Sequence, residues 1–147
     1  MTKYFFFVLA NNVTIRHCIY KDQFNMIKAL DLFGRVLISA LFFLNGIFKI
    51  NNYEGTIGWM ESFGLPGILI IPAIALEIIG PILIVIGYQT RIAAAALSLF
   101  CFATAIIFHN DFADQVQLTA FLKNIALAGG FLFLVVNGAK GFCLDKK

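Results

Sequence analysis

The sequence predicts an all-helical integral membrane protein, a bundle of four transmembrane helices with both termini in the cytoplasm. Hydrophobic residues make up 61% of the 147 and charged residues 13%, whereas soluble proteins average about 45–50% and about 25%. Four apolar segments reach the roughly 20 residues that a helix needs to cross a hydrocarbon layer of about 30 Å. Lys and Arg are concentrated in the segments that would face one side of the membrane.

The four predicted spans follow one another with short connections. They are Leu32 to Ile50, Leu65 to Ile86, Ile92 to Phe108, and Phe121 to Val136 with its flanking residues. Gly87-Tyr88-Gln89-Thr90 is so short a connection that the second and third spans should form an antiparallel hairpin.

Residues 1–28 differ from the rest of the chain and are treated as an N-terminal extension to a domain at 29–147. Their apolar run, Phe5 to Leu9, is stopped by Asn11-Asn12. It falls short of the roughly 7–15-residue apolar core of a signal peptide, and no A-x-A-like cleavage site follows. The extension is either an interfacial appendage or sequence upstream of a true start at Met26.

The orientation is predicted from the short loops, because cytoplasmic loops keep an excess of positive charge. Basic residues precede the first span, mark the turn after the second and follow the fourth: Lys3, Arg16, Lys21, Lys28, Arg91, Lys140, Lys146 and Lys147. The other two loops, Asn51 to Gly64 and His109 to Ala120, contain acidic residues but no Lys or Arg. Within the first of them, Trp59 to Phe63 is a short amphipathic stretch expected at the membrane interface.

Polar residues in the first span share one side of the helix. Arg35, Ser39, Asn45, Gly46 and Lys49 fall within an arc of about 120° when plotted at about 100° per residue. This side should turn away from lipid. Arg35 and Lys49 lie near opposite ends, and the favoured interpretation is that each extends its charge to the headgroups.

Glu77 is the most informative polar residue, because it lies near the centre of the second span, about 18 Å from its outer end at helical rise. A carboxylate at that depth must be protonated, paired or hydrated in a cavity. Two interpretations stay open. Glu77 forms a buried pair with Arg35 that fixes the helix register, or it handles a ligand or a proton.

The third and fourth spans add a packing stripe and a polar entrance. Ser98, Cys101, Ala105 and His109 share one face of the third span, which is typical of a seam between helices. Lys123 lies on the same face of the fourth span as Gly130. Lys49, His109 and Lys123 are therefore expected around a polar vestibule of mixed charge.

Other classes of site are not expected. His109, Asp111 and Asp114 lack the ligand spacing of known metal motifs, so no metal site is predicted. The three cysteines form no C-x-x-C pair, which argues against a disulfide framework and a dithiol enzyme. Basic residues are spread along the chain, so nucleic acid is not an expected partner.

From about Leu30 to Asp145 the chain resembles the DoxX family of small bacterial membrane proteins. The resemblance is carried, in order, by Gly34-Arg35, Asn45-Gly46-Ile47-Phe48-Lys49-Ile50, Met60-Glu61-Ser62-Phe63-Gly64-Leu65-Pro66, Ala75-Leu76-Glu77-Ile78-Ile79-Gly80, Gly87-Tyr88-Gln89-Thr90-Arg91, Phe108-His109-Asn110-Asp111-Phe112, Gln115, Phe121-Leu122-Lys123-Asn124, Gly129-Gly130, and the tail Gly138-Ala139-Lys140-Gly141-Phe142-Cys143-Leu144-Asp145. Cys143 stands where serine is common in the family. The resemblance implies four transmembrane helices in a bacterial inner membrane.

The resemblance also implies a redox role, since some relatives are associated with thiosulfate:quinone oxidoreduction and others with membrane redox complexes. The sequence contains no flavin, nicotinamide or iron–sulfur motif of its own. We therefore expect an accessory subunit that binds a quinone or similar small amphipathic molecule, in the bilayer, beside a soluble redox subunit and as a homo-oligomer. The candidate ligand or proton-handling residues are Glu77, Arg35, Asn45, Lys49, His109, Lys123 and Asn124. The alternatives are a non-catalytic membrane scaffold and a small-molecule transporter that acts as an oligomer.

Overall fold

The computed structural model describes residues 2–145, and the side chains of residues 23–145, and over that range it is helical without a strand. Five α-helices and one 3-10 turn follow in order: α1 (Thr2–Asn51), α2 (Tyr53–Ser62), η1 (Gly67–Leu69), α3 (Ile70–Ile86), α4 (Thr90–Phe108) and α5 (Gln115–Asn137). The predicted all-helical class is confirmed.

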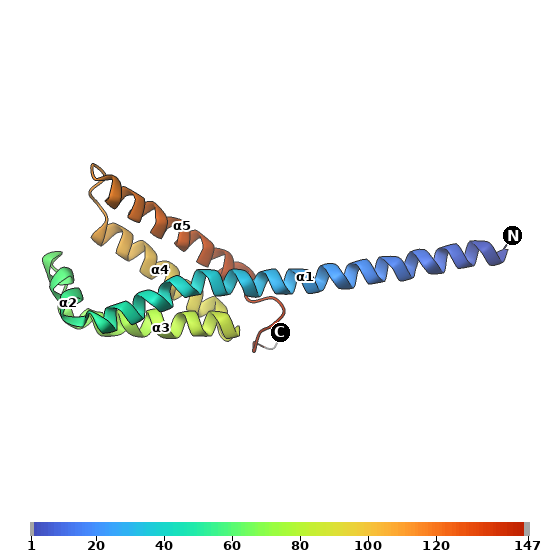
Figure 1. Cartoon of the computed structure of the whole chain (residues 1–147), viewed down its shortest axis with the longest axis horizontal. Helices are drawn as coiled ribbons and strands as arrows, with labels where there is room; N and C mark the ends of the chain where they lie inside the picture. Colours follow the sequence, from blue (N-terminus) through green and yellow to red (C-terminus); the bar gives the residue numbers. More distant parts are fainter. Residues whose placement is uncertain (1, 146–147) are drawn as a thin grey trace.

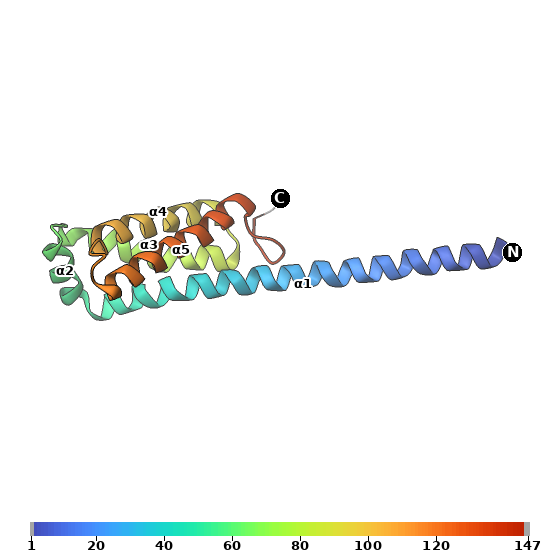
Figure 2. The same ribbon diagram turned by 90° about the horizontal axis from the view of Figure 1, so that it is seen from above.

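Helix α1 is one unbroken helix of 50 residues, about 75 Å long at helical rise. Its second half packs against α3, whereas its first half extends past the bundle toward the N-terminus (Figures 1 and 2). The helix continues through residues 28 and 29 without a break, so the division at that point stays a prediction. The side chains of the predicted extension up to residue 22 lie outside the described part.

Within the part of the chain that the structure describes, three helices are long and apolar enough to cross a membrane: Gly67–Ile86, Thr90–Phe108 and Gln115–Asn137. They correspond to the second, third and fourth predicted spans. The last begins six residues before Phe121, because the carboxylate of Asp114 accepts a hydrogen bond from the Val116 amide and caps the helix there. The first predicted span lies within α1.

The predicted hairpin between α3 and α4 is confirmed. Gly87 ends α3 in the left-handed region with φ 70°, and its amide and that of Tyr88 donate to carbonyls of the last turn. Gln89 also has a positive φ of 46° and directly precedes α4. These two residues with positive φ reverse the direction of the chain within a few residues, as left-handed residues at helix ends commonly do.

The helices are arranged as two pairs joined by the α3–α4 hairpin. Helix α1 packs along α3, and α4 packs along α5. The pairs are close at the end where α3 meets α4 and diverge toward α2, which gives the V shape of Figure 1. We call the two ends of the bundle the α2 end and the C-terminal end.

The core lies where the two pairs meet. Its buried members are mostly small or aromatic: Phe42, Ile84, Ala93, Ala94, Leu97, Cys101, Ala128 and Phe131. The predicted seam on α4 is confirmed, since Ser98, Cys101 and Ala105 are buried and the Ser98 hydroxyl donates to the Ala128 carbonyl at 3.2 Å. Small residues at these positions let α4 and α5 approach closely.

Candidate functional site

A cavity of about 420 Å³ opens between the two helix pairs at the α2 end. Its wall is mainly apolar and aromatic, with residues from every α-helix, among them Leu41, Phe100 and Leu127. Because α1 and α3 diverge there from α4 and α5 (Figure 1), the core side chains do not fill this space. A volume of this size with a few polar groups in an apolar wall is typical of a small-molecule site.

An ion pair lies in the wall of the cavity. Lys49 Nζ lies 2.6 Å from both carboxylate oxygens of Glu77, a residue that is only 2% exposed. The Lys49 side chain keeps 22% of its surface exposed. An ammonium group has three N–H donors, and two are directed to Glu77. The third forms no hydrogen bond within residues 23–145 and can serve a molecule in the cavity, although Lys49 Nζ also lies 5.9 Å from the centroid of the Phe100 ring.

The close approach of α1 to α3 depends on Gly46. A Cβ atom at this position would lie 2.8 Å from Ile78 Cδ1 and 3.2 Å from Glu77 Cβ. The missing side chain therefore lets the backbone of α1 lie directly against α3. Three residues later on α1, Lys49 is within reach of the Glu77 carboxylate.

The predicted pairing of Glu77 with Arg35 is wrong, and so is the interpretation that Lys49 and Arg35 extend toward headgroups. Because α1 runs antiparallel to α3, Arg35 lies beside Ile84 and Val85. These residues are about 12 Å along the helix from Glu77 at helical rise. Lys49 extends along α1 toward the middle of the bundle instead of out of it.

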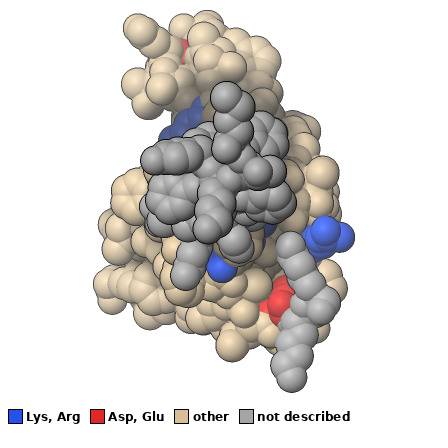
Figure 3. Space-filling view, turned by 90° about the vertical axis from the view of Figure 1, so that its right-hand side faces the viewer, with Lys and Arg blue, Asp and Glu red and all other residues tan. Residues whose placement is uncertain are grey.

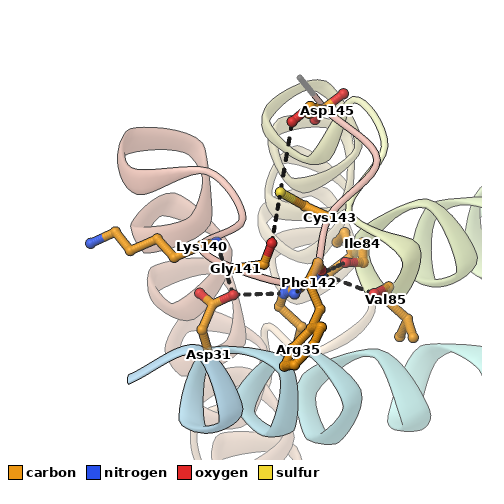
Figure 4. A network of polar contacts seen from close by, with 9 residues as sticks. All are labelled: Asp31, Arg35, Ile84, Val85, Lys140, Gly141, Phe142, Cys143 and Asp145. Carbon is orange, nitrogen blue, oxygen red and sulfur yellow. Dashed lines mark hydrogen bonds and ion pairs between the residues drawn. The ribbon is translucent and has the colours of Figure 1, made fainter. Parts of the chain in front are cut away.

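Arg35 belongs to a network at the C-terminal end, shown in Figure 4. It is 1% exposed, and its guanidinium donates to the carbonyls of Ile84 at 2.9 Å, Val85 at 2.9 Å and Phe142 at 2.7 Å, and to Asp31 at 3.0 Å. Asp31 also accepts from the backbone amide of Lys140 at 2.9 Å. These donors are used to hold the chain together, so the structure removes Arg35 from the candidate ligand site.

The other six candidate residues line the cavity, although the sequence placed them on four separate segments: Asn45, Lys49, Glu77, His109, Lys123 and Asn124. Asn45 lies one helical turn from Lys49 on α1, while Lys123 and Asn124 lie on α5. Within the described part of the chain, no hydrogen bond or ion pair is formed by the side chains of Asn45, Lys123 or Asn124. Their donors and acceptors are available to a ligand.

His109 lies at the C-terminal end of α4, where its Nδ1 is 2.7 Å from Gln117 Oε1. An amide oxygen can only accept a hydrogen bond, so in this arrangement Nδ1 carries the proton. In the neutral ring the second nitrogen, Nε2, is then an acceptor. Within residues 23–145 no group of three His, Cys, Asp or Glu side chains is placed to hold a metal ion.

An aromatic cluster covers the α2 end of the cavity. The Trp59 ring stacks on Phe108 with centroids 4.3 Å apart, and Phe63 meets both rings edge-on at 5.2 Å. Thr56 and Met60, from the same helix, are buried beneath it. The sequence predicted Trp59 to Phe63 as an interfacial segment but did not predict that α2 forms a wall of the cavity. The sequence signal for this wall was the spacing of four residues between Thr56 and Met60, which puts both on one face of a helix.

Comparison with known proteins gives the family of the chain. The sequence profile of the DoxX family matches residues 30–110. The chain belongs to the DoxX family. It is 37% identical to inner membrane protein YqjF of Escherichia coli K12 over 115 residues, covering 78% of this chain and 88% of that protein.

Two further relatives extend this result. Inner membrane protein YphA of Escherichia coli K12 is 32% identical over 125 residues, which cover 80% of this DoxX protein and 89% of YphA. A Bacillus subtilis 168 protein named "putative oxidoreductase CatD" is 37% identical over 65 residues, 44% of this chain and 48% of that protein. No solved structure matches the chain. With three apolar helices of spanning length, this DoxX protein is an integral protein of the inner membrane in contact with the lipid bilayer.

Proposed function

We propose that this DoxX protein binds a quinone, or a small amphipathic molecule like it, in the cavity at the α2 end, as an accessory subunit of a membrane redox system. The observation that carries the proposal is the buried Lys49–Glu77 pair in the wall of an apolar cavity between helices. Ionisable groups inside a membrane protein usually mark the path of a ligand or a proton. The oxidoreductase name of the Bacillus subtilis relative agrees with a redox role.

The proposal includes four membrane crossings. Residues 35–49 of α1 lie beside α3, the span that begins at Gly67, and so share its depth. The basic residues Lys28, Arg35, Arg91 and Lys140 lie at the C-terminal end, which we place in the cytoplasm. Alkaline phosphatase and green fluorescent protein fused after Lys147 test this orientation. The expected result is fluorescence without phosphatase activity, and the reverse would refute it.

The chemistry of the cavity suits both redox states of a quinone. Its carbonyls need donors, which the third Lys49 N–H and the Asn45 amide can supply. The hydroxyls of a quinol need acceptors, and the amide oxygens and His109 Nε2 can supply these. A carboxamide carries both a donor and an acceptor, so Asn45 and Asn124 can bind either redox state of the quinone.

Quinone reduction takes up two electrons and two protons. In this proposal the electrons come from a soluble redox subunit, the partner class expected from the family. Lys49 can pass one of these protons to a quinone oxygen and regain a proton through Glu77, and Lys123 in the same cavity wall can pass the other. Self-association stays a prediction.

The test is mass spectrometry of quinones that co-purify with the protein extracted in mild detergent. Asn45→Leu and Asn124→Leu should each lower the bound quinone, by about tenfold for a lost pair of hydrogen bonds. Asn110→Leu is the matched control, because Asn110 is exposed at the same end of the bundle and does not line the cavity. Equal quinone in wild type and both cavity variants would refute the proposal.

One observation favours the scaffold alternative, namely that Lys49 and Glu77 satisfy each other without a ligand. The double substitution Lys49→Met/Glu77→Met separates the two functions. A scaffold keeps its fold and everything that it binds, since apolar residues of similar size replace a buried ion pair at little cost. The quinone proposal requires this variant to fold and to lose the quinone.

A further inference from the structure

A second hollow of about 360 Å³ lies between α1 and α5 near the C-terminal end, away from the cavity described above. Gly34, Ile38, Gly130 and Phe133 line it, and we call it the α1/α5 hollow. A Cβ atom at Gly34 would meet no other atom within 4 Å. The missing side chain at Gly34 therefore leaves this part of the hollow open.

The α1/α5 hollow is separated from the cavity by a layer of aromatic and aliphatic side chains. The rings of Phe42 and Phe131 meet edge-on with centroids 5.1 Å apart. The Ile38 side chain lies close to the backbone of α5, because a Cβ atom at Gly130 would be 2.9 Å from Ile38 Cδ1. Phe42 is 4% exposed and Phe131 fully buried. A molecule in one of the two spaces therefore does not extend into the other.

The lining of the α1/α5 hollow changes from apolar to polar along its length. Toward the C-terminal end it reaches Asp31, Asn137 and Lys140. The Asp31 carboxylate is already occupied by Arg35 and by the Lys140 backbone. The Lys140 side chain points away from that network in Figure 4, and among residues 23–145 its ammonium is bonded only to the neutral Asn137 amide oxygen, at 3.2 Å. Lys140 thus has two unused donors at the polar end of an apolar groove.

The surroundings of Lys140 are cationic. Lys28 packs on Gly141, and Arg91 packs on Gly138, the two glycines on either side of Lys140. Within the described part of the chain, Arg35 is the fourth cation here, against the carboxylates Asp31 and Asp145. Figure 3, which looks at this end, shows basic side chains at several separate places and an acidic patch at the lower right. An anionic group is therefore favoured over a zwitterionic one.

We propose that the α1/α5 hollow binds one anionic phospholipid, with an acyl chain along Gly34, Ile38 and Phe133 and the phosphate on the Lys140 ammonium. The bilayer supplies such a chain wherever a groove opens to it, and an unfilled apolar space loses its packing contacts. The polar end lies where a headgroup would lie if α1 crosses beside α3. This inference rests on that crossing, and it does not depend on the quinone.

The test measures phospholipid that stays on the purified protein in native mass spectrometry. The protein is first reconstituted in nanodiscs of equal phosphatidylglycerol and phosphatidylcholine and then released. Gly34→Leu fills the α1/α5 hollow, while Gly129→Leu is the matched control: Gly129 also has no atom within 4 Å of a Cβ but lies outside the hollow. Lys140→Gln removes the cation and keeps the groove.

The wild type and Gly129→Leu should keep one phosphatidylglycerol, and Gly34→Leu should keep about tenfold less. Lys140→Gln should prefer phosphatidylglycerol less strongly than the wild type does. The proposal is overturned if Gly34→Leu keeps as much lipid as Gly129→Leu, if the wild type keeps none, or if Lys140→Gln prefers phosphatidylglycerol as strongly as the wild type. Quinone measured in the same samples should be unchanged in Gly34→Leu, which separates this result from the fate of the cavity.

Discussion

Replacing Lys49 by methionine should destabilise the protein far more than replacing both members of the ion pair. At 2.6 Å and an effective dielectric constant of about 20, the attraction between Lys49 and Glu77 is about 6 kcal/mol. This attraction offsets the several kcal/mol that each ion loses when it leaves water. Lys49→Met removes the attraction and leaves Glu77 desolvated, at an expected cost of about 3–5 kcal/mol.

The two other variants of the cycle should behave differently. Glu77→Met should cost about 1–3 kcal/mol, because the partly exposed Lys49 ammonium can turn toward the cavity. Lys49→Met/Glu77→Met should lie within about 1 kcal/mol of the wild type, since no buried charge is left. The coupling free energy between positions 49 and 77 is therefore expected to be large and to stabilise the native Lys49–Glu77 pair.

Equilibrium unfolding in mixed dodecyl maltoside and SDS micelles measures these differences. Trp59 is the only tryptophan, and its contact with Phe108 at the cavity makes its fluorescence a reporter of the α2 end. As a control, Arg35→Met and Glu77→Met should combine additively, because the structure separates them. Additive costs for Lys49 and Glu77, or coupling between Arg35 and Glu77, would refute the arrangement of charges described above.

Three further predictions concern the backbone and the C-terminal end. Gly87→Ala should lower the thermal midpoint more than Gly64→Ala: both glycines have positive φ, worth about 1–2 kcal/mol, but only at Gly87 would the new Cβ lie 2.5 Å from Cys143. Arg35→Leu should make the chain after α5 open to carboxypeptidase in detergent, while the wild type resists; equal digestion would argue against the network in Figure 4. Gly46→Val should push α1 from α3 and abolish the coupling between Lys49 and Glu77, and a variant that retains it would show that the close approach is not needed.

Much of the fold follows from the sequence because length and hydropathy control helices in a membrane. The predicted segments match α3, α4 and α5 to within a few residues, and the turn at Gly87 was predicted from the shortness of the connection. The start of α5 was not predicted, because Asp114, which caps the helix, lies in a polar loop that a hydropathy criterion leaves outside the span. The continuation of α1 before residue 29 also lacked a signal, since polar residues interrupt its apolar runs without breaking the helix.

The residues that line the site were predicted, but the contacts between them were not. Helix periodicity puts Asn45 and Lys49 on one face, yet it contains no information on how far α1 slides along α3. That offset is set by the contact of Gly46 with Ile78, and it decides that Glu77 meets Lys49 instead of Arg35. The aromatic cover from Trp59 was missed for a similar reason, because only the tertiary fold brings α2 over the end of α4.

The bond from Arg35 to the Phe142 carbonyl also has a consequence for the order in which the protein is made. Its two members are 107 residues apart, so this donor stays without its acceptor until Phe142 has been translated. The amides of Gln89 and Thr90 likewise lack their acceptor until Asp145 has been made. A chain that stops before these residues is left with unmatched polar groups at the turn between α3 and α4. The newly made protein thus satisfies the polar groups at this turn only after residues 142–145 have left the ribosome.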